Sequence, residues 1–148
     1  MTFRTLLPAL VALSWACAAA GPAASTPEPD NALADRWLEV GVVKSNQATV
    51  YIDTVSLDRH EDVAAVWMMY RYETNHTDAL GKNYRRYLVH ETINCARRTV
   101  AADSWATYTA SGSVVMSGTM PPRTDAVPPG SVIEAVMLKA CRPTSPPS

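Results

Sequence analysis

Histidine and aspartate residues are the first candidates in this sequence for metal or acid–base chemistry. The three histidines, His60, His76 and His90, show no i, i+4 spacing on an expected helix, so they do not form a paired zinc-ligand arrangement. Asp53 and Asp58 could act as paired hydrolytic carboxylates, but both flank expected strand ends, where aspartate commonly accepts a hydrogen bond from a turn N–H. His90 has no nucleophile placed with it, which favours a surface or interface role. The sequence therefore predicts no catalytic residue, no cofactor-binding residue and no metal ligand.

The cysteines could form a disulfide or bind a metal. The chain has three of them, Cys17, Cys95 and Cys141, and removal or lipidation of Cys17 would leave an even pair. Two cysteines without a CxxC motif or clustered histidines are too few ligands for a structural metal site. We therefore predict a Cys95–Cys141 disulfide in an oxidising compartment. In the chain-entropy model such a bridge stabilises the domain by about 4 kcal/mol.

The N-terminal residues predict export. Arg4 gives a short positive region, Leu6–Ala20 is an uncharged apolar run, and Ala18-Ala19-Ala20 fits a signal-peptidase site with cleavage before Gly21. We therefore expect a signal peptide over residues 1–20. The run is shorter than the roughly 20 residues that a membrane-spanning helix needs, so we expect no membrane span. Lipidation at Cys17 is an alternative, although the residues before it fit a lipoprotein motif imperfectly.

Two low-complexity segments flank one expected domain. Residues 21–36 combine prolines, small residues and acids without periodicity, which predicts a flexible linker. Residues 143–148 predict a disordered tail for the same reason. The remaining residues, 37–142, are enough for one small domain. A formal net charge of −1 argues against a nucleic-acid or anionic-membrane partner.

Alternating and β-branched segments predict a sheet. Strands are expected over residues 37–43, 48–53, 63–72, 82–95, 99–109 and 112–117, with a charged turn over 58–62 and loops over 74–81 and 120–130. In the 82–95 strand the odd positions, including Val89, Ile93 and Cys95, are apolar, so their face should be the core face. Glu91 breaks this alternation and predicts a bulge or slip.

A short helix is expected near the C-terminus. Ser131 and Glu134 form an S-x-x-E capping box. Apolar residues then follow at helical spacing and form one stripe: Ile133, Val136, Met137, Ala140 and Cys141. Because Cys141 ends this stripe and Cys95 lies on the expected core face, the disulfide should attach the helix to the sheet.

The strand over residues 63–72 is apolar on both faces, but one short helix covers only one side of a sheet. The uncovered face, with side chains from the next strand, gives a candidate interface of Trp67, Met69, Tyr84, Leu88 and His90. A bare apolar face of this kind marks an interaction site. It predicts a protein partner or a homodimer. The rival prediction is that the sheet curls over and buries this face itself.

A second candidate surface is basic. Lys82, Arg85 and Arg86 stand close together in sequence, and Arg97 and Arg98 are expected nearby. These residues could bind an acidic partner, or they could form a solvated edge whose aliphatic stems pack on the sheet. The near-zero net charge favours the solvated edge.

With these elements placed, the chain resembles the bacterial surface-adhesin protein E family. The resemblance rests on the order and spacing of several weak motifs across the expected domain: Trp37, YIDTVSL at 51–57, the apolar strand with Trp67 and Tyr70, INCARRT at 93–99, and PPGSVIEAVMLKAC at 128–141. Glu91 departs from the pattern, because the family's acid is expected one position nearer the cysteine. The resemblance implies an α+β fold, with a single antiparallel sheet of about six strands and a C-terminal helix tethered by the disulfide.

The resemblance also implies a non-enzymatic binding module, exported to the periplasm or the cell surface. Its namesake is a surface lipoprotein that binds host extracellular-matrix and serum proteins. Since fold does not fix function, a periplasmic envelope-maintenance or inhibitor domain and an unrecognised enzyme are alternatives. A pocket with convergent polar groups and shifted pKa values would favour an enzyme. A flat sheet face with exposed aromatic residues would favour a binding role.

Overall fold

The computed structural model describes residues 35–142, which form an α+β fold. The expected signal peptide over 1–20, nearly all of the expected linker over 21–36, Cys17 and the tail over 143–148 lie outside the described residues. The elements in chain order are β1 (Trp37–Val43), β2 (Ala48–Asp53), β3 (Asp58–His60), β4 (Val63–Thr77), β5 (Asn83–Asn94), β6 (Thr99–Tyr108), β7 (Val114–Thr119), β8 (Thr124–Ala126) and the helix α2 (Val132–Ala140). No helix within residues 35–142 is long and apolar enough to cross a membrane.

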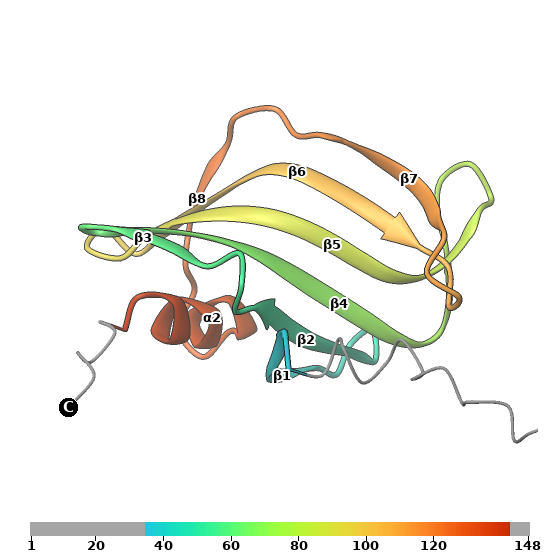
Figure 1. Cartoon of the computed structure of the whole chain (residues 1–148), viewed down its shortest axis with the longest axis horizontal. Helices are drawn as coiled ribbons and strands as arrows, with labels where there is room; N and C mark the ends of the chain where they lie inside the picture. The colour runs from blue at the N-terminus through green and yellow to red at the C-terminus, as the bar shows by residue number, and fades with distance from the viewer. Residues whose placement is uncertain (1–34, 143–148) are drawn as a thin grey trace, which may run out of the picture.

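All strand pairs are antiparallel and belong to one curved sheet (Figure 1). Six strands, the number that the resemblance implies, follow the order β1-β2-β4-β5-β6-β7, while β3 pairs with β4 and β8 pairs with β6. Both extra strands lie where a turn and a loop were expected. Glu61 has a positive φ of 51°, which lets residues 61–62 form a tight turn and brings β3 back along β4. The expected loop over 74–81 is also shorter, because β4 continues to Thr77.

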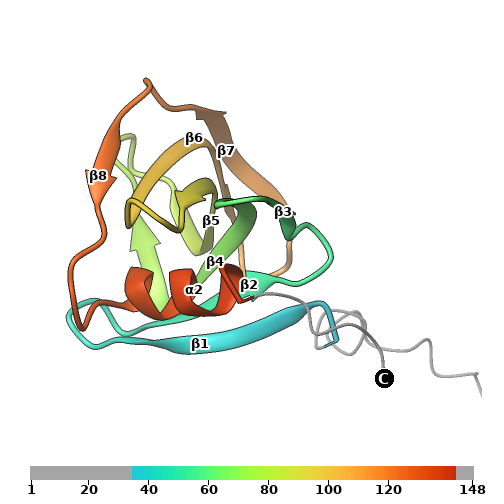
Figure 2. The ribbon, with the colours of Figure 1, turned by 90° about the vertical axis from the view of Figure 1, so that its left-hand side faces the viewer.

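The hydrophobic core lies between the helix and the face of the sheet that curves around it (Figure 2). Most of its buried residues come from β2, β4, β5 and α2: Val50, Ile52, Val66, Met68, Val89, Ile93, Val136, Met137 and Ala140. Val89 and Ile93 confirm the predicted core face of β5. Each such large apolar side chain contributes about 1.5–3 kcal/mol through its burial. The helix is thus held mainly by its apolar stripe.

The predicted Ser131 N-cap is present at the start of α2, and the Glu134 side chain bonds to the N–H of Gly130, one residue before the position expected for a capping box. The Ser131 side chain accepts a hydrogen bond from the Glu134 N–H at 3.1 Å, and Glu134 Oε2 accepts one from the Gly130 N–H at 2.7 Å. Glu134 also forms an ion pair with Arg98 from the β5–β6 turn. The start of the helix is therefore connected to the end of the central strands.

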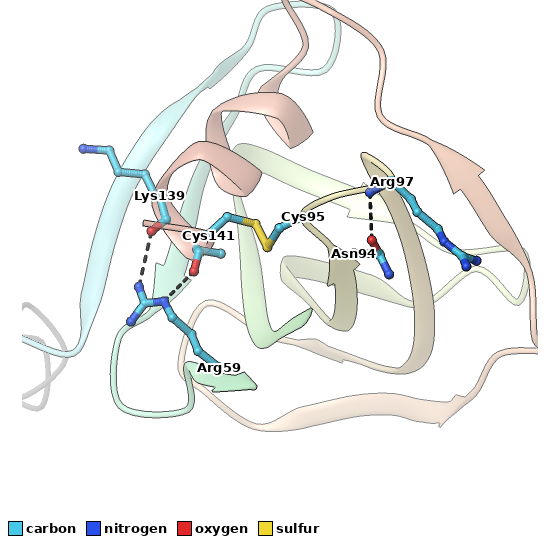
Figure 3. Close-up of a disulfide and its surroundings, with 7 residues drawn as sticks. Arg59, Asn94, Cys95, Arg97, Lys139 and Cys141 are labelled. Carbon is cyan, nitrogen blue, oxygen red and sulfur yellow. Dashed lines mark hydrogen bonds between the residues drawn. A yellow bond between two sulfur atoms is a disulfide. The ribbon is translucent and has the colours of Figure 1, made fainter. Parts of the chain in front are cut away.

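The C-terminal end of α2 is held by the predicted disulfide between Cys95 and Cys141, whose Cα atoms are 5.8 Å apart (Figure 3). Arg59 of β3 lies beside it and donates hydrogen bonds to the carbonyl oxygens of Ala140 at 2.5 Å and Lys139 at 3.3 Å. The last carbonyl groups of a helix have no partner within the helix. Arg59 satisfies two of them, so β3 has a direct role in docking the helix.

Asp53 ends β2 and is fully buried. It accepts a hydrogen bond from the Val55 N–H at 3.1 Å, which confirms its predicted turn role. Arg36 donates to both carboxylate oxygens, at 2.9 Å and 2.5 Å. Burial alone would raise the pKa of Asp53, but the hydrogen bonds from Arg36 and Val55 outweigh it, and the pKa lies below its usual value. Asp53 therefore fixes the start of β1 against the end of β2.

Candidate functional site

The outer face of the sheet, opposite the helix, brings together four of the five candidate interface residues. In the β4–β5 ladder Trp67 lies directly opposite His90, and Met69 lies opposite Leu88. The ring centroids of Trp67 and His90 are 5.2 Å apart. Directly opposed side chains on one face of a sheet pack against each other. These four residues, Trp67, Met69, Leu88 and His90, are called the outer patch below.

The outer patch is less exposed than the sequence predicts. Met69 is only 8% exposed, the His90 side chain is 25% exposed, and Trp67 and Leu88 are partly buried. His90 Nδ1 contacts the Asp103 carboxylate of β6 at 2.9 Å. Hydrogen bonds from Ser104 and His90 hold the pKa of Asp103 below its usual value. The centre of the outer face is therefore a packed, partly covered surface.

Tyr84, the fifth candidate, belongs to a different group of side chains. It pairs with His76 in the ladder, four residues along β5 from Leu88, and its ring contacts Tyr72 at a centroid distance of 5.7 Å. The β4–β5 register shifts between Arg71 and His76. This irregularity changes which side chains Tyr84 contacts. The even-numbered alternation along β5 that it shares with Leu88 and His90 is therefore not enough to place it with the outer patch.

A groove of about 900 Å³ continues from the outer patch toward β1 and β2. Its lining includes Trp37, Tyr51, Met69, Arg71 and Arg86. Tyr51 lies opposite Met69 in the β2–β4 ladder, and the Arg71 guanidinium lies 5.5 Å from the centroid of the Tyr51 ring. Sequence reasoning missed Trp37 and Tyr51, because their place beside Met69 depends on the pairing of β2 with β4. The alternation of β2 carries no information about that partner.

The expected basic cluster is divided into two parts. Arg85 and Arg86 line the groove, and Arg85 Nε donates to the Tyr72 carbonyl at 3.0 Å. Arg97 and Arg98 lie in the turn at the opposite end of β5, where Arg98 pairs with Glu134. The arginines therefore do not form one continuous basic surface.

The residues considered for acid–base or metal chemistry are separate from one another. Asp58 contacts His60 Nε2 at 3.1 Å on an exposed surface, whereas Asp53 is buried against Arg36. His76 packs on Tyr72 with ring centroids 3.8 Å apart. Among residues 35–142, no three His, Cys, Asp or Glu side chains gather in a group that could hold a metal ion.

Glu91 lies in a second, smaller pocket on the core face, which could not be predicted from the sequence. The β5–β6 register shifts between His90 and Glu91, which confirms the predicted irregularity at this position. The pocket has a volume of about 220 Å³. Burial raises the pKa of Glu91 to about 7. A shifted pKa in a pocket is a feature expected of an enzyme, but the described lining contains no Ser, Cys, His or Lys side chain to act with Glu91.

Comparisons with known proteins agree on one family. The model of the family described as surface-adhesin protein E matches residues 37–142. Crystal form II of Haemophilus influenzae protein E is similar with a TM-score of 0.55 and 13% identity, covering 70% of this chain and 86% of that one. Protein E from non-typeable Haemophilus influenzae gives a TM-score of 0.53 and 13% identity, covering 71% and 75%. At this identity the structural similarity shows the fold alone. No curated protein sequence matches the chain.

Proposed function

Because the chain belongs to the surface-adhesin protein E family, we propose that it is an exported, non-enzymatic module that binds protein partners through its outer face. The observation that supports this most is the composition of the groove, where Trp37, Tyr51, Met69 and Arg71 lie together. Aromatic residues, methionine and arginine are the residue types enriched at the centres of protein–protein interfaces. Host-matrix adhesion is the form of binding that the family name favours.

The arrangement of the groove also suits a protein ligand. Its residues project from strands within one hydrogen-bonded sheet, so little side-chain or backbone ordering is needed on binding. Arg71 is exposed, and its contact with the Tyr51 ring orients the guanidinium. An oriented guanidinium can donate two parallel hydrogen bonds to a carboxylate. The lining also contains Glu39 and Glu73, but its three arginines, Arg71, Arg85 and Arg86, outnumber them. A partner segment that combines an acidic side chain with an apolar one would therefore complement this surface.

A second copy of the chain is a further partner that the outer face could bind. The outer patch is apolar at Trp67, Met69 and Leu88, and such a patch can pair with itself around a two-fold axis. In that arrangement the outer patch would form a homodimer and the arginine-bearing groove would bind the host protein. In an inhibitor or envelope-maintenance role, the outer face of this chain would bind a bacterial envelope protein. Envelope proteins therefore belong in any panel of tested partners.

The exchange Arg71→Glu is expected to weaken binding by about tenfold or more, because it removes a bidentate donor and places a like charge against an acidic partner. The measurement is biolayer interferometry of the purified exported protein against immobilised collagen, fibronectin, laminin and bacterial envelope proteins. Arg123→Glu is the matched control, since Arg123 is exposed and lies outside the groove lining. Equal losses in the two variants, or no loss in Arg71→Glu, would contradict the assignment of the outer face.

A further inference from the structure

The pocket around Glu91 has no role in the outer-face proposal. It lies on the core side of the sheet, between the β4–β5 pair and the segment that follows β7, and is called the inner pocket below. Its lining includes Asn46, Tyr70, Tyr72, Tyr87, Glu91 and Met120. At about 220 Å³ it is smaller than the roughly 300–1,000 Å³ of pockets for drug-sized ligands. It is therefore suited to a ligand of only a few non-hydrogen atoms.

Two oxygen atoms give the inner pocket an unusual polar character. Glu91 Oε2 and Asn46 Oδ1 are buried, and neither has a hydrogen-bond partner within residues 35–142. A buried acceptor without a donor destabilises the folded state, and more so when it is charged. When Glu91 is ionised both atoms are acceptors, so the group that would satisfy them in that state must carry hydrogen-bond donors.

The charge of the inner pocket indicates which kind of donor fits. Glu91 is the only acidic or basic side chain in the described lining, and burial raises its pKa because no cation compensates its charge. The other titratable groups are tyrosines: burial raises the pKa of Tyr70 and Tyr72 to about 12 and also raises that of Tyr87. These hydroxyls stay neutral throughout the range in which Glu91 ionises. The pocket thus offers one negative charge without a positive partner.

The tyrosine rings add a second attraction for a cation. The centroids of Tyr70 and Tyr87 are 6.0 Å apart with the ring planes tilted by 47°, and Tyr72 lines the same pocket. The faces of aromatic rings attract cations within about 6 Å. A water molecule could satisfy the two oxygens, but it would use neither the rings nor the charge.

We propose that the inner pocket binds a small primary or secondary organic ammonium ion. Glu91 Oε2 and Asn46 Oδ1 accept hydrogen bonds from its N–H groups, and the rings of Tyr70, Tyr72 and Tyr87 surround the charge and the adjoining methylene groups. Binding requires the ionised form of Glu91. The ligand would bind on the side of the sheet opposite the outer face, so this proposal does not depend on the proposed function.

The test is an NMR titration of the purified exported protein with n-butylammonium at about pH 7.5, above the pKa of Glu91. We expect saturable shifts of the Glu91 carboxyl and the tyrosine ring resonances. The neutral isostere n-butanol should bind at least about tenfold more weakly, since it lacks the charge. Glu91→Gln should lower the affinity by about tenfold or more, and it should fold because it removes a buried charge. Glu61→Gln, in the exposed β3–β4 turn, is the matched control and should leave the affinity unchanged.

The pH dependence provides a readout that a general packing role would not give. Affinity for n-butylammonium should rise about tenfold per pH unit below the pKa of Glu91 and level off above it. Equal binding of n-butanol, an unchanged affinity in Glu91→Gln, or no shifts at high millimolar n-butylammonium would each overturn the proposal. Tetramethylammonium has no N–H donors, so binding of that ion as tight as n-butylammonium would also overturn it.

Discussion

Replacing both Cys95 and Cys141 by alanine is expected to lower the free energy of unfolding by about 4 kcal/mol. The two residues are 46 positions apart, and opening this loop frees the unfolded chain to occupy many more conformations. A domain of this size has a net stability of only about 5–15 kcal/mol, so the loss is a large fraction of the total. The helix would then be held only by its apolar stripe and by contacts such as those of Arg59.

Urea-induced unfolding of the exported protein under non-reducing conditions measures this effect. Wild type treated with a reducing agent should show nearly the same loss as the double variant, since both lack the covalent link. Leu138→Ala, on the exposed side of α2, is the control and should change the stability by less than about 1 kcal/mol. A double variant within about 1 kcal/mol of wild type would show that the disulfide contributes little to holding the helix.

Replacing Asp53 by alanine is expected to cost about 3 kcal/mol. The change leaves the Val55 N–H without its acceptor and removes a fully buried side chain. Arg36 is 49% exposed, so water can solvate its freed guanidinium, which limits the cost of breaking the ion pair. The pKa of Asp53 is lower in the folded protein than in the unfolded chain. The ionised carboxylate therefore stabilises the folded state at pH values above the unfolded-state pKa, and this stabilisation is lost as the pH falls through the folded-state pKa.

The variant Asp53→Asn removes the charge and keeps the shape of the side chain. The difference in free energy of unfolding between wild type and this variant should therefore be largest near neutral pH and should shrink as the pH falls below about 4. Chemical unfolding at several pH values tests this dependence. Asp58→Ala is the matched control, because Asp58 is exposed and pairs only with the exposed His60, and it should change the stability by less than about 1 kcal/mol. A loss in Asp53→Asn that stays constant down to about pH 2 would contradict the assigned role of the ionised carboxylate.

Local patterns predicted those parts of the fold that depend on neighbouring residues. The Ser131–Glu134 cap and the odd-numbered core face of β5 are confirmed, because each is set within one turn or one strand. The strands β3 and β8 were not predicted. Each has three residues, too few to show an alternation, and β8 lies in a proline-rich segment.

The two candidate sites show why function was harder to predict than fold. The alternation of side chains between the two faces of consecutive strands was enough to group four residues correctly: Trp67, Met69, Leu88 and His90. The same alternation placed Tyr84 with the wrong neighbours, because an irregularity in the partner strand determines which residues it contacts. The inner pocket is formed by residues that are distant in sequence. From the sequence alone, Glu91 could be identified only as a polar residue that interrupts an apolar alternation.

Hydroxyl-radical footprinting of the exported protein, with and without a saturating partner from the binding panel, tests the central claim most directly. The claim is that the outer face is the protein-binding surface. It predicts that oxidation of Trp37, Tyr51 and Trp67 falls on complex formation, while Leu138 on the exposed side of α2 is oxidised equally in both states. Protection of the α2 surface with unchanged oxidation of Trp37, Tyr51 and Trp67 would contradict it.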